Sequence, residues 1–120
     1  MNIVSNSNCI FDYYEIIGCY NSMISFPPEY DKENRDSLVT ATRFEVARCK
    51  LIWDKLRIST IHPNNVPRLR EAEVMMEHPL LYKKYEFSKA IRDMHNYVLE
   101  ELYNLKSRCE RGSVESNIME

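Results

Sequence analysis

The residues of this chain that are able to hold a metal ion are few and scattered. The thiols are Cys9, Cys19, Cys49 and Cys109, and the imidazoles are His62, His78 and His95. A structural zinc site draws on closely spaced cysteine or histidine ligands, often two cysteines separated by two residues. No such pair occurs in the sequence. We therefore expect no metal and no cofactor.

Residues suited to catalysis are equally sparse. The only glycines are Gly18 and Gly112, and neither belongs to a loop that would cradle a phosphate. No serine sits in a nucleophile-elbow motif. Cys49 has basic neighbours in the sequence, but adjacent residues on a helix point in different directions, so its thiol gains little activation from them. These absences favour a protein that is not an enzyme and has no small-molecule substrate.

Each cysteine lies in an apolar stretch, which is typical of free, buried thiols in a reducing compartment. No apolar run reaches the ~20 residues that a membrane-spanning helix needs. The N-terminus shows no basic flank and no small-residue cleavage site of a secretory signal. The sequence thus favours an intracellular protein, cytoplasmic or nuclear, without a membrane partner.

The periodicity of apolar residues predicts an all-α fold. Near the C-terminus, seven apolar residues recur at steps of three and four and share one helix face. They are Phe87, Ile91, Met94, Val98, Leu102, Leu105 and Cys109. The helix that contains them is expected over 79–110, with Pro79 in its first turn and Gly112 as its C-cap.

Prolines and helix-capping residues divide the rest of the chain into segments. Helices are expected at about 8–26, 34–58 and 67–77, although the β-branched and aromatic content of 9–26 leaves a strand open there. Asn34, Asp36 or Ser37 is the expected N-cap of the second helix. The prediction is a small four-helix bundle-like domain over 1–112 with a long C-terminal helix, followed by a disordered tail, 113–120.

The second predicted helix has a broad apolar side made of two adjacent stripes. One comprises Leu38, Ala41, Phe44, Ala47 and Leu51, and the other Val46, Cys49, Trp53 and Leu56. The first predicted helix is apolar around most of its circumference. A single small domain rarely has enough neighbouring elements to cover so much of one helix. We expect part of it to bind another protein chain, or a second copy as a homodimer, through Phe11, Tyr13, Tyr14, Ile17, Tyr20 and Ile24. The alternative is a central helix buried within its own bundle.

Basic residues concentrate in the middle of the chain. Residues 35–70 contain eight Lys or Arg and three acids, whereas the whole chain has a net charge of −2. A strip for an acidic partner or a nucleic acid would comprise Arg43, Arg48, Lys50, Lys55, Arg57, Lys83 and Lys84. The alternative is a solvated face balanced by nearby acids. Because dedicated nucleic-acid domains are usually clearly basic, the sequence favours a protein-interaction module, an adaptor or regulatory subunit, over a nucleic-acid-binding protein.

Overall fold

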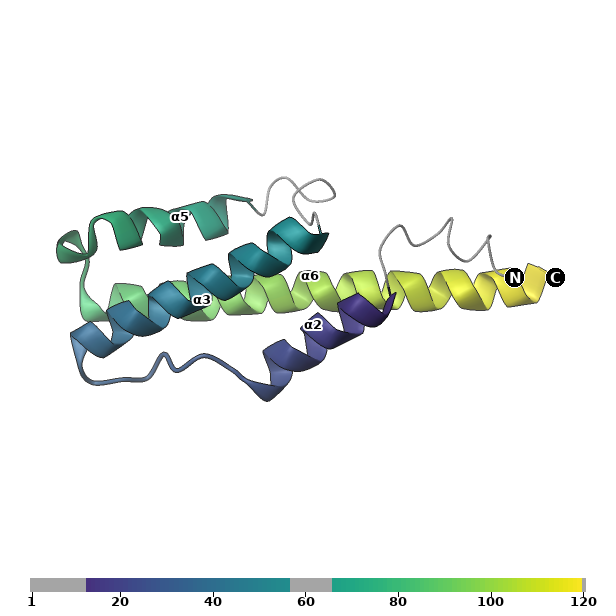
Figure 1. Ribbon diagram of the computed structural model, residues 1–120, viewed down its shortest axis with the longest axis horizontal. Helices are drawn as coiled ribbons and strands as arrows, with labels where there is room; N and C mark the ends of the chain where they lie inside the picture. The colour runs from purple at the N-terminus through teal and green to yellow at the C-terminus, as the bar shows by residue number, and fades with distance from the viewer. Residues whose placement is uncertain (1–12, 57–65, 120) are drawn as a thin grey trace. The chain divides into compact units, whose positions relative to one another are not determined.

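The described part of the chain is entirely helical apart from its connections. The computed structural model describes residues 13–56 and 66–119. The helices are α2 (Tyr13–Ser25), α3 (Arg35–Leu56), α5 (Val66–Glu77) and α6 (Lys84–Met119), with a short 3-10 helix η2 (Pro79–Leu81) before α6 (Figure 1). No strand occurs in these two ranges, so the prediction of an all-α fold with a long C-terminal helix is confirmed, and the described part of 9–26 is helix.

The chain divides into two compact units. One contains α2 together with the part of α6 from Leu99 onward, and the other extends from Phe26 to Val98. In the first unit, the rings of Tyr20 and Tyr103 lie 6.1 Å apart, centroid to centroid. The sequence prediction that one domain covers 1–112 stays a prediction.

The apolar stripe of the last helix is buried along its whole length. All seven predicted residues, from Phe87 to Cys109, are at most 4% exposed. Because α6 contributes to both units, the stripe residues from Phe87 to Val98 belong to the second unit. Those from Leu102 to Cys109 belong to the first. This prediction is confirmed residue by residue.

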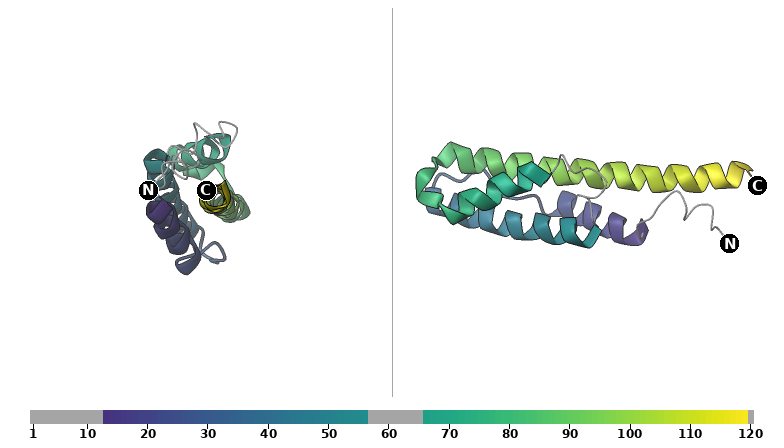
Figure 2. Two further views of the ribbon diagram at one scale, coloured as in Figure 1. Left: turned by 90° about the vertical axis from the view of Figure 1, so that its right-hand side faces the viewer. Right: turned by 90° about the horizontal axis from the view of Figure 1, so that it is seen from above.

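Three helices share the core of the second unit. Leu38 of α3, Met75 of α5, and Phe87 and Ile91 of α6 form one buried cluster. Figure 2 shows α3 and α5 running along the first part of α6. Apolar surface of this kind stabilises a fold by about 25 cal/mol for each Å² removed from water, so this cluster holds the three helices together.

Helix ends agree with the prediction at one point and differ at two. The Asn34 side-chain oxygen accepts the backbone N–H groups of Asp36 at 2.8 Å and Ser37 at 3.3 Å, which confirms Asn34 as the N-cap of α3. The last helix begins at Lys84 rather than at Pro79, because the prolyl segment forms the separate turn η2.

The second difference lies at the C-terminal end of α6. The helix continues to Met119, so Gly112 is not its C-cap. The expectation of a disordered tail over 113–120 stays a prediction. A glycine inside a helix costs only about 1 kcal/mol relative to alanine, and this penalty does not stop a long helix.

The cysteines only partly match the expectation of free thiols. Cys19 and Cys49 are not part of a disulfide, as expected. Cys109 is disulfide-bonded, so the expectation of a free thiol is wrong at this position.

Candidate interaction surface

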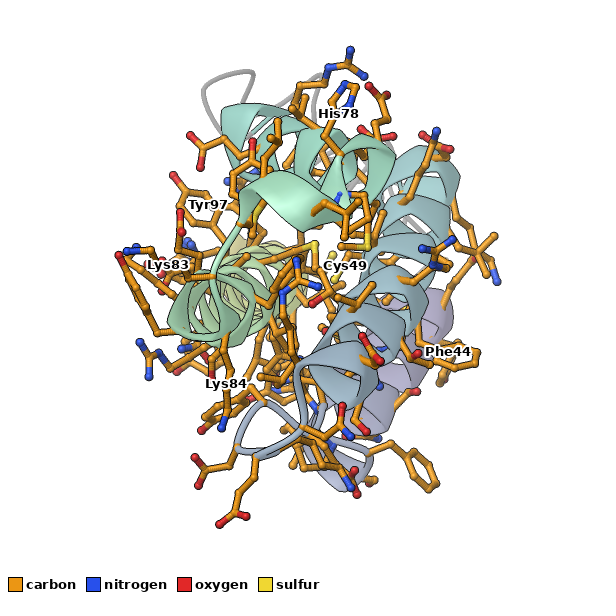
Figure 3. The ribbon with its side chains drawn as sticks, turned by 90° about the vertical axis from the view of Figure 1, so that its left-hand side faces the viewer. Phe44, Cys49, His78, Lys83, Lys84 and Tyr97 are labelled. Carbon is orange, nitrogen blue, oxygen red and sulfur yellow. The ribbon has the colours of Figure 1, made fainter. Side chains whose placement is uncertain are left out.

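The outer face of α3 presents large apolar side chains to solvent. The opposite side of this helix is buried through Leu38, Thr42, Glu45, Cys49, Ile52, Trp53 and Leu56. On the outer face, the side chains of Phe44 and Leu51 are 73% and 68% exposed. They are seven residues, two helical turns, apart, and exposed Ala47 lies between them on the same face. Figure 3 shows the Phe44 ring pointing away from the helices.

A groove adjoins Phe44 within the second unit. It has a volume of about 520 Å³, and its apolar lining is contributed by the connector before α3 and by the start of α3. The lining residues are Phe26, Pro28, Glu29, Lys32, Ser37, Thr40, Ala41, Phe44, Glu45 and Arg48. We call it the Phe44 groove. Phe26 and Phe44 are both exposed, and Phe44 both lines the groove and lies on the outer face of α3.

A buried polar cluster lies at the inner edge of the Phe44 groove. The Arg48 guanidinium is 2.7 Å from one Glu45 carboxylate oxygen, and the His95 Nδ1 is 2.9 Å from the other. Arg48 also donates from Nη1 to the backbone carbonyl of Phe26 at 2.6 Å. The cluster therefore joins α6, α3 and the connector that carries Phe26, and two of its members, Glu45 and Arg48, line the groove.

The contact between Glu45, Arg48 and His95 was not predicted from the sequence. Glu45 is only 3% exposed and His95 only 7%, although both residue types are usually outside. A signal was present: Glu45 falls in helical register with Leu38 and Cys49, and His95 follows a stripe residue directly. Sequence position alone does not pair two residues that are fifty positions apart.

The cluster does not activate a cysteine nucleophile. The Cys49 Sγ lies 3.5 Å from a Glu45 carboxylate oxygen. Burial, and secondly the neighbouring Glu45 charge, raise the pKa of the Cys49 thiol far above its usual range. The reactive form of cysteine is the thiolate, and this environment keeps the thiol protonated at neutral pH.

We expect Cys49 to resist alkylation in the folded protein. Because its pKa is raised, the thiolate fraction stays negligible up to pH 9, where an ordinary cysteine is largely reactive. Iodoacetamide labelling followed by peptide mass spectrometry measures this directly. The same chain in denaturant is the control, and Cys49 should label fully there. Rapid native labelling of Cys49 at pH 8 would contradict the assignment.

The predicted docking residues of α2 differ in exposure. Tyr14 and Ile24 are exposed, whereas Tyr13, Ile17 and Tyr20 are half-buried. Phe11 lies outside the described residues. The Tyr20 ring stands against Tyr103 and beneath the Lys106 ammonium, 5.9 Å from the ring centroid. The sequence-predicted patch is therefore partly used for contacts within the first unit.

The predicted basic strip is divided by ion pairs. Arg48 pairs with Glu45, and the Lys50 ammonium lies 3.3 Å from the Glu73 carboxylate of α5. Arg43 and Lys55 are exposed on α3, and Lys83 and Lys84 are exposed beside η2. Arg57 lies outside the described residues. The charges of Arg48 and Lys50 are thus matched by acids of the same chain.

Within the described ranges, no group of three histidine, cysteine or acidic side chains is placed to hold a metal ion. Comparison of the chain with protein-family models, with curated proteins and with solved structures found no match in any of the three. The functional interpretation therefore rests on the surface described above.

Proposed function

We propose that this protein is a non-enzymatic protein-interaction module, an adaptor or regulatory subunit, that binds a partner through the outer face of α3. The observation that supports this most directly is the exposure of Phe44 and Leu51 on one face, next to the Phe44 groove. Contiguous exposed apolar surface beside polar residues is typical of interaction sites. Aromatic side chains are also enriched among the residues that dominate binding energy at interfaces.

An amphipathic helix is the partner that fits this surface. A helix lying along α3 would present apolar residues at i, i+3 and i+7, one to Leu51, one to Ala47 and one to the Phe44 groove. Exposed Arg43 and Lys55 lie on either side of the apolar row. A partner helix with acidic residues flanking its apolar face would match these charges and gain orientation from them.

The nucleic-acid alternative has less support. Affinity for nucleic acid depends on the number of phosphates that free basic side chains neutralise. Lys50 and Arg48 already pair with acids of this chain, and exposed Phe44 and Leu51 lie among the basic residues of α3. Protein contact is therefore the function that this face favours.

The test is a chain in which Phe44→Ser and Leu51→Ser are combined. Both residues are exposed, so the melting temperature should stay close to that of the wild type. Capture of a partner identified with the wild-type chain should fall by at least about tenfold, since central apolar residues dominate interface energies. Binding of a synthetic helix from that partner, measured by fluorescence anisotropy, should fall equally.

The matched control is Asn96→Ser, which changes an exposed residue of the same unit outside the Phe44 groove. It should leave binding unchanged. Light scattering decides between a separate partner and a second copy. A wild-type dimer that the Phe44 and Leu51 substitutions dissociate would contradict a separate helical partner. Undiminished capture by the double variant would contradict the proposal as a whole.

A further inference from the structure

The outer face of α2 carries no charged side chain. Ile16 and Met23 are buried on the inner face of this helix, in the first unit. Helical periodicity turns seven uncharged residues away from them, most of them exposed: Tyr14, Ile17, Gly18, Asn21, Ser22, Ile24 and Ser25. Tyr14 is 83% and Ile24 is 51% exposed. The solvent face of an amphipathic helix usually carries charges, whereas the centre of a protein interface is depleted of them.

Four of these residues have the spacing of a contact between two helices. They follow one another at steps of three, four and three residues, which is the spacing of the positions that meet in a two-helix coiled coil. We call them the α2 seam: Tyr14, Ile17, Asn21 and Ile24. Within the first unit, α6 contacts α2 through the Tyr20 ring, which faces Tyr103 and the Lys106 ammonium. Because Tyr20 lies outside the α2 seam, this contact does not use the seam.

A glycine lies beside the middle of the α2 seam. Gly18 is inside α2, and a glycine in a helix interior costs about 1 kcal/mol relative to alanine. A Cβ atom at this position would have no atom within 4 Å, so no neighbour in the described part of the chain requires the missing side chain. Ser25 lies two turns further along the same side of the seam. Small residues at such positions allow a second backbone to approach closely.

Asn21 indicates which chain lies on the α2 seam. Its exposed side-chain amide stands in the middle of the seam, where an apolar partner would remove its water without replacing the hydrogen bonds. An amide both donates and accepts, so the same asparagine of a second, parallel copy satisfies it. A single asparagine at such a position fixes the register of two paired helices. Neither the seam nor Gly18 and Ser25 beside it bears a charge, so two copies meet without repulsion.

We propose that the protein forms a parallel homodimer through the α2 seam, in which Asn21 of one protomer hydrogen-bonds to Asn21 of its partner. Tyr14, Ile17 and Ile24 then pair with their own counterparts. The contact is short, since α2 has 13 residues, and we expect a dimer that dissociates on dilution. Among the described residues no helix, α2 included, combines the length and apolar character needed to span a membrane. The α2 seam is separate from the α3 face, so this inference does not depend on the proposed function.

The experiment is light scattering of the full chain over a dilution series. We expect the mass of a dimer at high concentration and a decline toward the monomer mass on dilution. Asn21→Asp should raise the dissociation constant at least about tenfold, because two carboxylates would face each other across the contact. Asn21→Val should associate at least as tightly as the wild type, since a polar residue in a seam fixes register at a cost in stability. Gly18→Leu fills space that is open in the monomer and should also weaken association at least about tenfold, without lowering the melting temperature of the monomer.

The matched control is Asn104→Asp, which makes the same substitution at an exposed position of α6 in the first unit and should leave association unchanged. Circular dichroism must show all variants folded, which is expected because the substituted residues are exposed. Two results would overturn the inference: a wild-type chain that is monomeric at every concentration, or a dimer that Asn21→Asp and Gly18→Leu leave intact. Neither result affects the α3 proposal, which partner capture by the Phe44 and Leu51 variant tests.

Discussion

A chain carrying Met94→Asp is expected to be largely unfolded. Met94 is 2% exposed and lies between Ile91 and Val98 in the buried stripe of α6. Its neighbours across a small cavity are Ala72 and Met75 of α5. A carboxyl group placed there loses most of its hydration, and the lysine that lines the cavity, Lys89, already pairs with Asp93. The substitution should therefore lower the free energy of unfolding by more than about 4 kcal/mol. That amount approaches the whole stability of a small domain, about 5–15 kcal/mol.

Circular dichroism and the fluorescence of Trp53 measure this loss. Trp53 is the only tryptophan and is buried, so unfolding of the second unit should shift its emission to the red. The control is Asn96→Asp, which adds the same carboxylate at an exposed position of the same helix and should change stability by no more than about 0.5 kcal/mol. A melt of Met94→Asp that coincides with the wild type would show that the stripe is not the core.

The second large effect is expected from Glu45→Ala. The carboxylate of Glu45 is shared by Arg48 and His95 at 2.7 and 2.9 Å. Its removal leaves the half-buried Arg48 guanidinium and the buried His95 imidazole without this acceptor. Breaking a buried pair by deleting one partner typically costs about 3–5 kcal/mol. We expect a loss in the free energy of unfolding within this range, measured by urea denaturation.

Two controls test whether the loss of stability comes from the contacts of Glu45. Glu77→Ala removes an exposed acid of the same unit and should change stability by about 0.5 kcal/mol or less. Glu45→Ala introduced into an Arg48→Ala chain should cost less than in the wild type, because the two residues share one interaction. If Glu45→Ala alone lowers stability by under about 1 kcal/mol, the cluster does not stabilise this unit.

The polar cluster also relates stability to the proposed binding surface. Arg48 contacts Glu45 and the Phe26 carbonyl at once, and all three residues line the Phe44 groove. In Glu45→Ala, we expect Arg48 to lose its position in the groove lining, in addition to the loss in the free energy of unfolding. Stability and partner binding should therefore fall together in this variant, whereas the Phe44 and Leu51 substitutions should affect binding alone.

Local periodicity was sufficient to predict the helices and the most buried face. The steps from Phe87 to Cys109 place seven apolar residues on one side of a helix, and all seven are buried. Asn34 caps α3 as its side-chain chemistry predicts. Both features depend on relations between residues about one helical turn apart, and such short-range relations can be recognised in the sequence itself.

Only the tertiary structure decided which parts of a broad apolar side are covered. The predicted stripe of α3 is buried at Leu38 but exposed at Phe44 and Leu51, while Glu45 between them is buried. The arc of a helix that becomes buried depends on where neighbouring helices lie, and here α6 brings His95 to Glu45 from fifty residues away. The same holds for Leu80 and Leu81 of η2, which are 88% and 77% exposed in a turn that Arg35 contacts from the start of α3. Long-range pairings of this kind are not determined by periodicity, because it specifies the faces of a helix without specifying what packs against them.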